Sequence, residues 1–138
     1  MSPNPHLYTA ETEKPTACFV EEFVTLAEAK GFVINNTQSM NMKDTFPRHG
    51  SEVPEEFDLH MIQLCKPPKA SKSLTANPER SILMPKFVHV FSGKEKTQVR
   101  FLGYGADEIA DLVKEDPAFP DSLAQTYEGI RNLINQAL

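Results

Sequence analysis

The chain has 138 residues, 40% of them hydrophobic and 24% charged, which is typical of a globular protein with one core and excludes a disordered chain. Its formal net charge of −5 argues against non-specific nucleic-acid binding, which requires a basic surface. No apolar run approaches the roughly 18 residues of a membrane span, and residues 1–6 lack the basic and apolar regions of a signal peptide. We therefore expect one cytoplasmic domain over residues 1–138, frayed at residues 1–5, with neither a membrane nor a nucleic acid as partner.

The first part of the chain predicts a strand, a helix and a second strand. Residues 6–11 are a candidate strand, and a helix begins at Pro15 and Thr16, residue types that favour helix starts. Gly31 fits the position after a helix end, and residues 32–37 follow as a strand. The apolar residues of the helix recur at helical spacing and form a core-facing stripe. They are Phe19, Val20, Phe23, Val24, Leu26 and Ala27.

Residues 38–56 show no strand pattern. A segment this long between two strands of a compact domain is often functional or partly helical. We expect one or two helical turns over residues 40–46 and a connector elsewhere.

A central unit of strand, short helix and strand spans residues 57–91. The strands at 57–65 and 87–91 are largely apolar on both faces, whereas a strand with one face in water shows a clean polar side. We therefore expect the second face to be covered, either by the C-terminal helix or by another subunit. The helix between the strands ends at Asn77 and Pro78.

The last third predicts a hairpin and two helices. A turn at residues 92–96 leads into a strand at 97–102, and a short helix at 106–114 is stopped by Pro117. The final helix carries a stripe at spacings of 4, 3, 4 and 3: Leu123, Tyr127, Ile130, Ile134 and Ala137. The element order predicts a two-layer α+β fold. It has an antiparallel sheet that leans toward the ferredoxin-like arrangement, with helices on one face and extra C-terminal helices.

Three short motifs of the central unit occur in the same order in a known family. They read Cys65-Lys-Pro-Pro-Lys-Ala70, then Leu74-Thr-Ala-Asn-Pro78, then Leu83-Met-Pro85 before an apolar strand. With these motifs the chain resembles the DUF302 family over roughly residues 16–113. The resemblance implies an α+β fold and a homodimer, and it does not itself assign an activity. The chain departs from the family pattern at Lys66, where Asn is usual, and at Lys86, where Cys is frequent, which removes a thiol partner for Cys65.

Cys65 is the candidate catalytic residue. It ends a strand and precedes a helix, and Lys66 and Lys69 are close in sequence. A helix N-terminus and nearby cations favour the thiolate, although a free cysteine equally fits a small buried hydrophobe. The same helix start suits an anion bound by Lys66, Lys69 and free backbone N–H groups. Cys18, on the apolar side of the first helix, is interpreted as a packing residue.

Histidine and methionine residues suggest a metal or ligand site. His60 and His89 lie on strands that are expected to be close in the sheet. If they share a face, they bind a ligand or, together with His49, Met40 and Met42, a soft metal such as copper. The alternative is a histidine packed within or beside the core, and methionine commonly fills gaps between side chains.

These residues lead to three hypotheses. The first is a homodimeric binding module that holds a small ligand, an anion or a metal near Cys65 and the 38–56 segment. The second is a thiol-active protein, a redox protein or sulfur carrier, that uses Cys65. The third is a structural or assembly partner without a small-molecule site. The sequence contains no Ser-His-Asp set, paired-carboxylate motif or phosphate loop, so it leaves open both the cofactor and whether the protein is an enzyme.

Overall fold

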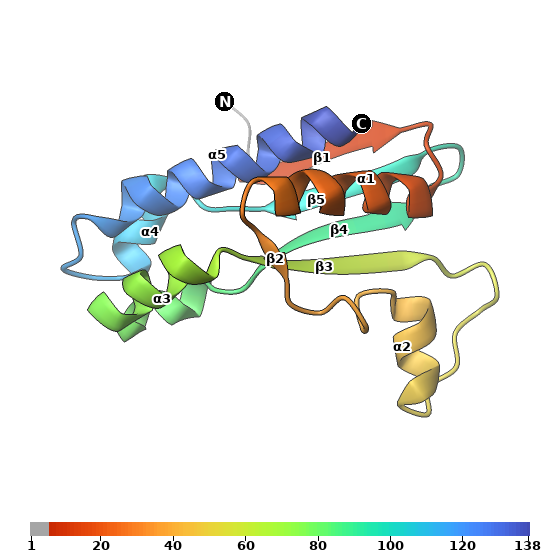
Figure 1. The fold of residues 1–138 in the computed structure, drawn as a ribbon, viewed down its shortest axis with the longest axis horizontal. Coiled ribbons are helices and arrows are strands. Elements are labelled where there is room, and N and C mark those ends of the chain that lie inside the picture. Colours follow the sequence, from red (N-terminus) through yellow and green to blue (C-terminus); the bar gives the residue numbers. More distant parts are fainter. Residues whose placement is uncertain (1–5) are drawn as a thin grey trace.

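A computed structural model describes residues 6–138, so the expectation for residues 1–5 lies outside the described residues. The five strands of the sheet lie in the order β1-β5-β4-β3-β2, and every neighbouring pair is antiparallel (Figure 1). The strands are β1 (Leu7–Thr12), β2 (Val33–Ile34), β3 (Leu59–Cys65), β4 (Lys86–Ser92) and β5 (Thr97–Leu102). The α+β class and the antiparallel sheet are therefore confirmed.

The helices connect and cover these strands. They are α1 (Thr16–Ala29), α2 (Met42–Arg48), α3 (Pro67–Ala76), the 3-10 helix η1 (Pro78–Leu83), α4 (Ala106–Leu112) and α5 (Phe119–Ala137). The predicted helical turns in the 38–56 segment are confirmed as α2. Among residues 6–138, no helix has both the length and the apolar character that a bilayer crossing demands.

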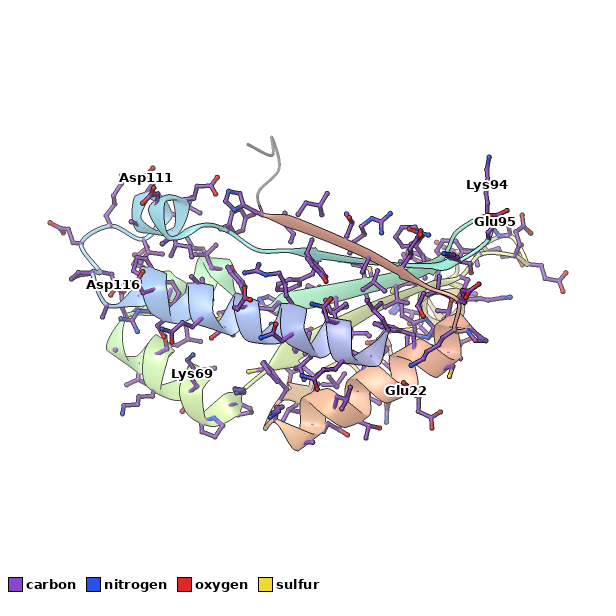
Figure 2. The ribbon with its side chains drawn as sticks, turned by 90° about the horizontal axis from the view of Figure 1, so that it is seen from above. Glu22, Lys69, Lys94, Glu95, Asp111 and Asp116 are labelled. Carbon is purple, nitrogen blue, oxygen red and sulfur yellow. The ribbon has the colours of Figure 1, made fainter. Side chains whose placement is uncertain are left out.

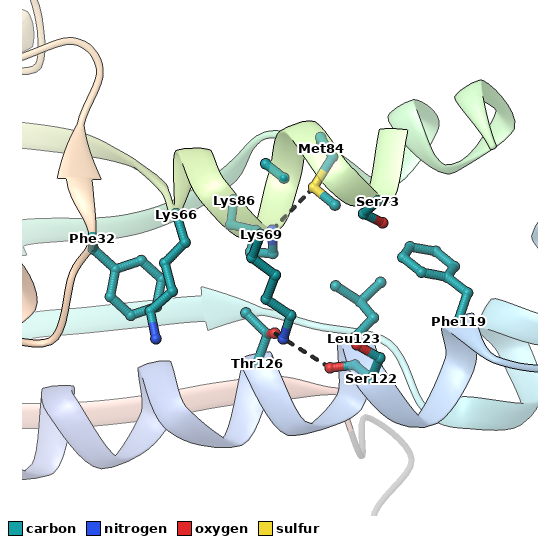
Figure 3. A pocket seen from close by; sticks show the side chains of 11 residues that line it. Phe32, Lys66, Lys69, Ser73, Met84, Lys86, Phe119, Ser122, Leu123 and Thr126 are labelled. Atoms are coloured by element: carbon teal, nitrogen blue, oxygen red, sulfur yellow. Dashed lines mark hydrogen bonds between the residues drawn. The ribbon is translucent and has the colours of Figure 1, made fainter. Parts of the chain in front are cut away.

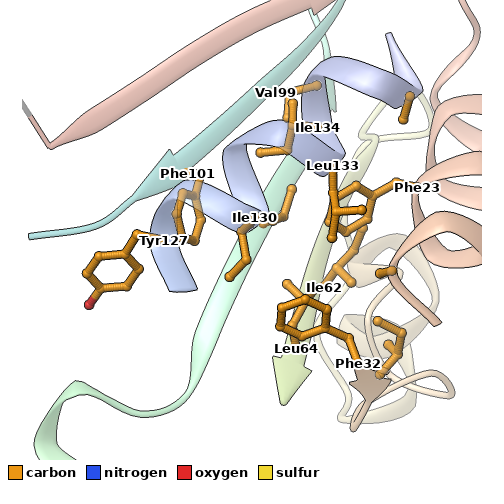
Figure 4. Packing of buried hydrophobic residues seen from close by; sticks show 14 of the residues in the cluster. Phe23, Phe32, Ile62, Leu64, Val99, Phe101, Tyr127, Ile130, Leu133 and Ile134 are labelled. Carbon is orange, nitrogen blue, oxygen red and sulfur yellow. The ribbon is translucent and has the colours of Figure 1, made fainter. Parts of the chain in front are cut away.

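The core lies between one face of the sheet and helices α1 and α5, which lie side by side beneath the strands in Figure 2. Ile62, Val90 and Val99 of the sheet are fully buried, as are Phe23 and Ile134 of the two helices. Figure 4 shows how the aromatic and branched side chains from both layers meet in this space. All five residues of the predicted C-terminal stripe are buried, which confirms that stripe.

Helix α1 ends as the sequence predicts. Gly31 has a φ of 90°, a left-handed value that suits glycine. The N–H groups of Gly31 and Phe32 donate to the carbonyls of Glu28 and Ala27, both at 3.0 Å. This is the Schellman arrangement, and it turns the chain directly into β2.

The sheet face turned away from α1 and α5 is called the open face below. Side chains alternate along each strand, so this face carries every second residue. It consists of Leu7, Thr9, Glu11, Leu59, Met61, Gln63, Cys65, Phe87, His89, Phe91, Gln98, Arg100 and Leu102. These side chains are partly or fully exposed, so the predicted cover by the C-terminal helix is found on the other face only.

Candidate functional site

A pocket that opens to solvent lies between α3 and the first half of α5, at the end of the sheet (Figure 3). The space between its lining atoms is about 380 Å³, a volume that includes the open solvent at its mouth. Three lysines and three hydroxyl residues line it, and no aspartate or glutamate does. The lining residues are Phe32, Lys66, Lys69, Ala70, Ser73, Met84, Lys86, Phe119, Ser122, Leu123 and Thr126.

Lys66 and Lys69 come from the start of α3, and Figure 3 shows both side chains reaching toward α5. The Nζ atom of Lys66 lies 4.7 Å from the centroid of the Phe32 ring, a cation–π contact. Lys69 Nζ donates a hydrogen bond of 2.7 Å to Thr126 Oγ1. Burial lowers the pKa of Lys69, and the nearby Lys66 ammonium lowers it further. Both lysines therefore contact neutral groups that leave their charge uncompensated.

The backbone at the start of α3 offers few donors. Pro67 and Pro68 occupy the first helical positions and have no N–H group. The N–H of Ala70 already donates to the Lys66 carbonyl at 2.8 Å. The side chains of Lys66 and Lys69, rather than free backbone N–H groups, are therefore the main anion-binding elements of this helix start.

Lys86 is the site residue that the sequence analysis did not select. It is the first residue of β4 and shares the helix-facing side of that strand with Val88 and Val90, which are fully buried. Its Nζ atom lies 3.0 Å from Met84 Sδ, a weak acceptor. Burial lowers the pKa of Lys86, Cys65 raises it by less, and Lys69 lowers it further. The alternation of β4 could have identified Lys86, because a lysine in step with two buried valines points toward the core side.

None of the three pocket lysines forms an ion pair within the described part of the chain. Lysines that are partly removed from water usually have a carboxylate partner, because burial penalises the ammonium form. The pocket is therefore a local concentration of positive charge in a protein whose formal net charge is −5.

An ion pair between Arg80 and Asp116 fixes the far wall of the pocket. The Arg80 guanidinium of η1 donates to both carboxylate oxygens of Asp116, at 2.6 and 2.8 Å. Arg80 also donates to Ser73 Oγ at 3.0 Å and lies 4.9 Å from the centroid of the Phe119 ring. Hydrogen bonds from Arg80 and Asn77 hold the pKa of Asp116 below its ordinary value. Two lining residues, one on α3 and one on α5, are thereby tied to the same arginine.

Cys65 lies at the end of β3 on the open face, in register with Val33 of β2. It is partly exposed. Lys66 and Lys69 reach to the other side of the sheet, toward α5, so the structure does not aim them at the thiol as the sequence analysis had supposed. The thiol hypothesis for Cys65 stays a prediction. Cys18 is exposed on α1, so its interpretation as a packing residue is wrong.

The predicted histidine and methionine set is dispersed. His60 pairs with Val90 and His89 pairs with Met61, so the two histidines lie on opposite faces of the sheet. Burial lowers the pKa of both. His49 is exposed after the end of α2, whereas Met40 and Met42 are partly buried beside it. Among residues 6–138, no group of three His, Cys, Asp or Glu side chains is arranged to hold a metal ion. The metal hypothesis stays a prediction.

The family model described as "Domain of unknown function DUF302" matches residues 8–137. The crystal structure of an uncharacterized conserved DUF302 protein from Bacillus stearothermophilus has a TM-score of 0.76, covering 97% of this chain and 99% of that chain at 13% sequence identity. No curated protein matches the chain. At that identity the structural likeness shows the fold alone, whereas the family model spans nearly the whole chain. The chain therefore belongs to the DUF302 family, as its central motifs predicted.

Proposed function

We propose that this protein binds a small anion, an organic acid or an inorganic oxyanion, in the pocket between α3 and α5. The observation that carries the proposal is the convergence of Lys66, Lys69 and Lys86 on one pocket without a carboxylate in its lining. An anion in this space would supply the missing counter-charge for Lys66 and Lys86, which are half-buried, and for the more exposed Lys69.

The neutral groups of the pocket suit such a ligand. Ser73, Ser122 and Thr126 place hydroxyl groups in the lining, and a hydroxyl donates to an anion while accepting from a lysine. Phe119 and Leu123 supply apolar walls, which favour a small organic acid over a fully hydrated ion. In a protein with a formal net charge of −5, this cluster of three lysines is a locally favourable place for an anion to bind.

The test is a thermal melt in the presence of phosphate, acetate or glycolate, against chloride at the same ionic strength. A ligand that binds only the folded state raises the melting temperature with its concentration. We expect this rise in the wild type and in Lys72→Gln, a matched change on the outer side of α3, where Lys72 is exposed. We expect it to be lost in the double variant Lys66→Gln and Lys69→Gln. An equal rise in all three proteins would show a general salt effect and reject the site.

The proposal includes a homodimer, with a second copy of the chain on the open face. About half of this face is apolar, and it places Leu7 opposite Leu102, residues that are 42% and 53% exposed. Exposed apolar residues that form a contiguous patch are typical of an interface. Arg100 and Glu11 give the same face both signs of charge, so a twofold-related copy can pair unlike charges across the contact.

A further inference from the structure

We propose that Lys86 is a nucleophilic amine that forms an imine with the carbonyl carbon of a small oxo acid bound in this pocket. The inference rests on the proposed function, because Lys66 and Lys69 would hold the carboxylate of the same molecule. The substrate class is a small carboxylate that also carries an aldehyde or ketone group.

The position of Lys86 supports this role. It enters the pocket from the end of a sheet strand, a more rigid support than the first turn of α3 that carries the other two lysines. Its nitrogen lies beside the Met84 sulfur, and no carboxylate lines the pocket to hold it as an ammonium ion. Burial lowers the pKa of Lys86 by more than Cys65 raises it, and Lys69 lowers it further, so the net shift raises the fraction of neutral amine. Proteins activate a lysine for attack on a carbonyl by removing it from water or by placing it beside another cation, because both favour the neutral amine.

The three lysines divide into two kinds. Lys66 and Lys69 contact a ring face and a hydroxyl group, so their side chains are held in place without an ion pair. They are suited to a carboxylate, which needs charged donors that stay charged. Lys86 contacts a thioether and lies at the end of the sheet, so it is suited to the carbonyl end of the ligand.

The step balances without a further reactant. The lone pair of Lys86 Nζ attacks the carbonyl carbon, the C–N bond forms, and the carbonyl oxygen takes up a proton. The resulting carbinolamine then loses water, which carries away the former carbonyl oxygen and both hydrogens of the neutral amine. The hydroxyl groups of Ser122 and Thr126 line the same pocket and are suited to pass the proton between nitrogen and oxygen.

The experiment is reductive trapping. The wild-type protein is incubated with glyoxylate and cyanoborohydride near neutral pH, digested, and analysed by mass spectrometry for the added mass on each lysine. We expect Lys86 to be modified faster than exposed Lys72 by about tenfold or more, because a lower pKa leaves more neutral amine. This comparison is made within one protein and needs no variant. Lys86→Arg, which keeps the positive charge but cannot form the imine, should lose the fast modification, and Lys72→Arg should keep it.

Three controls make the result decisive. Cys65→Ser should trap as fast as the wild type, because the amine and not the thiol attacks. Acetaldehyde, which lacks a carboxylate, should modify Lys86 far more slowly than glyoxylate. The rate with glyoxylate should rise with pH and level off below the pH at which an ordinary lysine does.

The outcomes separate the two proposals. If all exposed lysines and Lys86 react alike while glycolate still raises the melting temperature, the imine is rejected and anion binding stands. If neither trapping at Lys86 nor a shift with glycolate or phosphate occurs, both proposals fail. If Lys86 reacts equally fast with acetaldehyde, the oxo acid is rejected as the substrate class.

Discussion

At the scale of single residues, the partly buried ammonium group of Lys86 destabilises the fold, and the proposed anionic ligand would offset this loss. Its pKa is lowered in the folded protein, so the unfolded chain binds a proton more tightly than the folded chain does. Stability should therefore rise with pH through the lowered pKa of Lys86 and level off near 10.5, the ordinary value for lysine.

The substitution Lys86→Met tests this directly. It keeps a flexible apolar side chain and removes the amine, so we expect the free energy of unfolding at pH 7 to increase by about 1 kcal/mol. Urea unfolding at several pH values measures it, and the variant should lose part of the rise toward alkaline pH. Lys72→Met, on an exposed site of α3, should change stability by less than about 0.5 kcal/mol. A clear loss of stability in Lys86→Met would contradict the assignment of Lys86 as an unpaired, desolvated amine.

The Arg80–Asp116 pair is expected to stabilise the fold, in contrast to Lys86. The Asp116 side chain is 7% exposed, and its pKa is lowered chiefly by the Arg80 hydrogen bond. A carboxyl with a lowered folded pKa contributes stability above its ordinary pKa and loses it as the pH falls through the folded value. Asp116→Asn should lower the free energy of unfolding by about 2 kcal/mol at pH 7.

Unfolding curves at pH 7 and near pH 2 check this, because the difference between wild type and Asp116→Asn should shrink in acid. Asp111→Asn is the matched control, since the Asp111 side chain is 83% exposed and pairs only with Lys114 across one turn. A difference that stays constant with pH would mean that Asp116 stabilises the protein by packing rather than by its charge.

Residue roles were only partly predictable from the sequence. Lys66 and Lys69 follow a cysteine at a helix start, a pattern that predicts a charged site, and both line the pocket. Lys86 was noted only as a departure from a family pattern, because its importance depends on α5, which is distant in sequence. His60 and His89 illustrate the same limit. Whether two strand residues share a face depends on a register that neither strand encodes alone.

At the scale of elements, Gly103 shows how closely the sheet and α5 approach each other. A Cβ atom at this position would lie 2.9 Å from the ring carbons of Tyr127, which is buried. Gly103→Ala should therefore destabilise the protein by about 1 to 3 kcal/mol, because the Tyr127 ring packs on Phe101 and has little room to move. Thermal unfolding measures this loss. Gly129→Ala is the control, since a Cβ there meets no atom within 4 Å and suits a helix interior, so it should not destabilise.

Helices and strands with a regular spacing of apolar residues are predicted well by the sequence, whereas the extent of β2 is not. The predicted strand over 32–37 is shortened to Val33–Ile34; the Asn35 N–H still donates to the Gln63 carbonyl at 3.0 Å, and a side chain then takes over the pairing. Asn36 donates to the Met61 carbonyl at 2.8 Å and accepts from the Gln63 N–H at 2.9 Å, so its amide imitates a strand backbone. The pattern of apolar residues cannot reveal that a side-chain amide replaces the backbone pairing, because this replacement depends on the edge of β3.

At the scale of the whole molecule, the open face is the proposed interface of a homodimer. Leu102→Glu places a charge at its most exposed apolar position, so we expect the dimer to dissociate while the monomer stays folded. Sedimentation at micromolar concentration measures the mass, and circular dichroism checks the fold. Leu112→Glu is the matched control, because Leu112 is 49% exposed on α4 rather than on the sheet. A wild-type monomer, or equal masses for both variants, would reject the open face as the interface.

The place of β1 at the edge of the sheet has a consequence for how the chain acquires its structure during synthesis. Strands β2 to β5 each pair with a neighbour in sequence, whereas β1 pairs with β5, and the Arg100 side chain of β5 donates to the carbonyl of Ala10, 90 residues earlier. Thr12, the last residue of β1, and Lys14 also donate to the carbonyls of Leu138 and Ala137, at 2.9 and 2.8 Å. Closing so large a loop carries an entropic cost that local hairpins avoid. Strand β1 is therefore synthesised well before its partner, and it stays unpaired until β5 has been made.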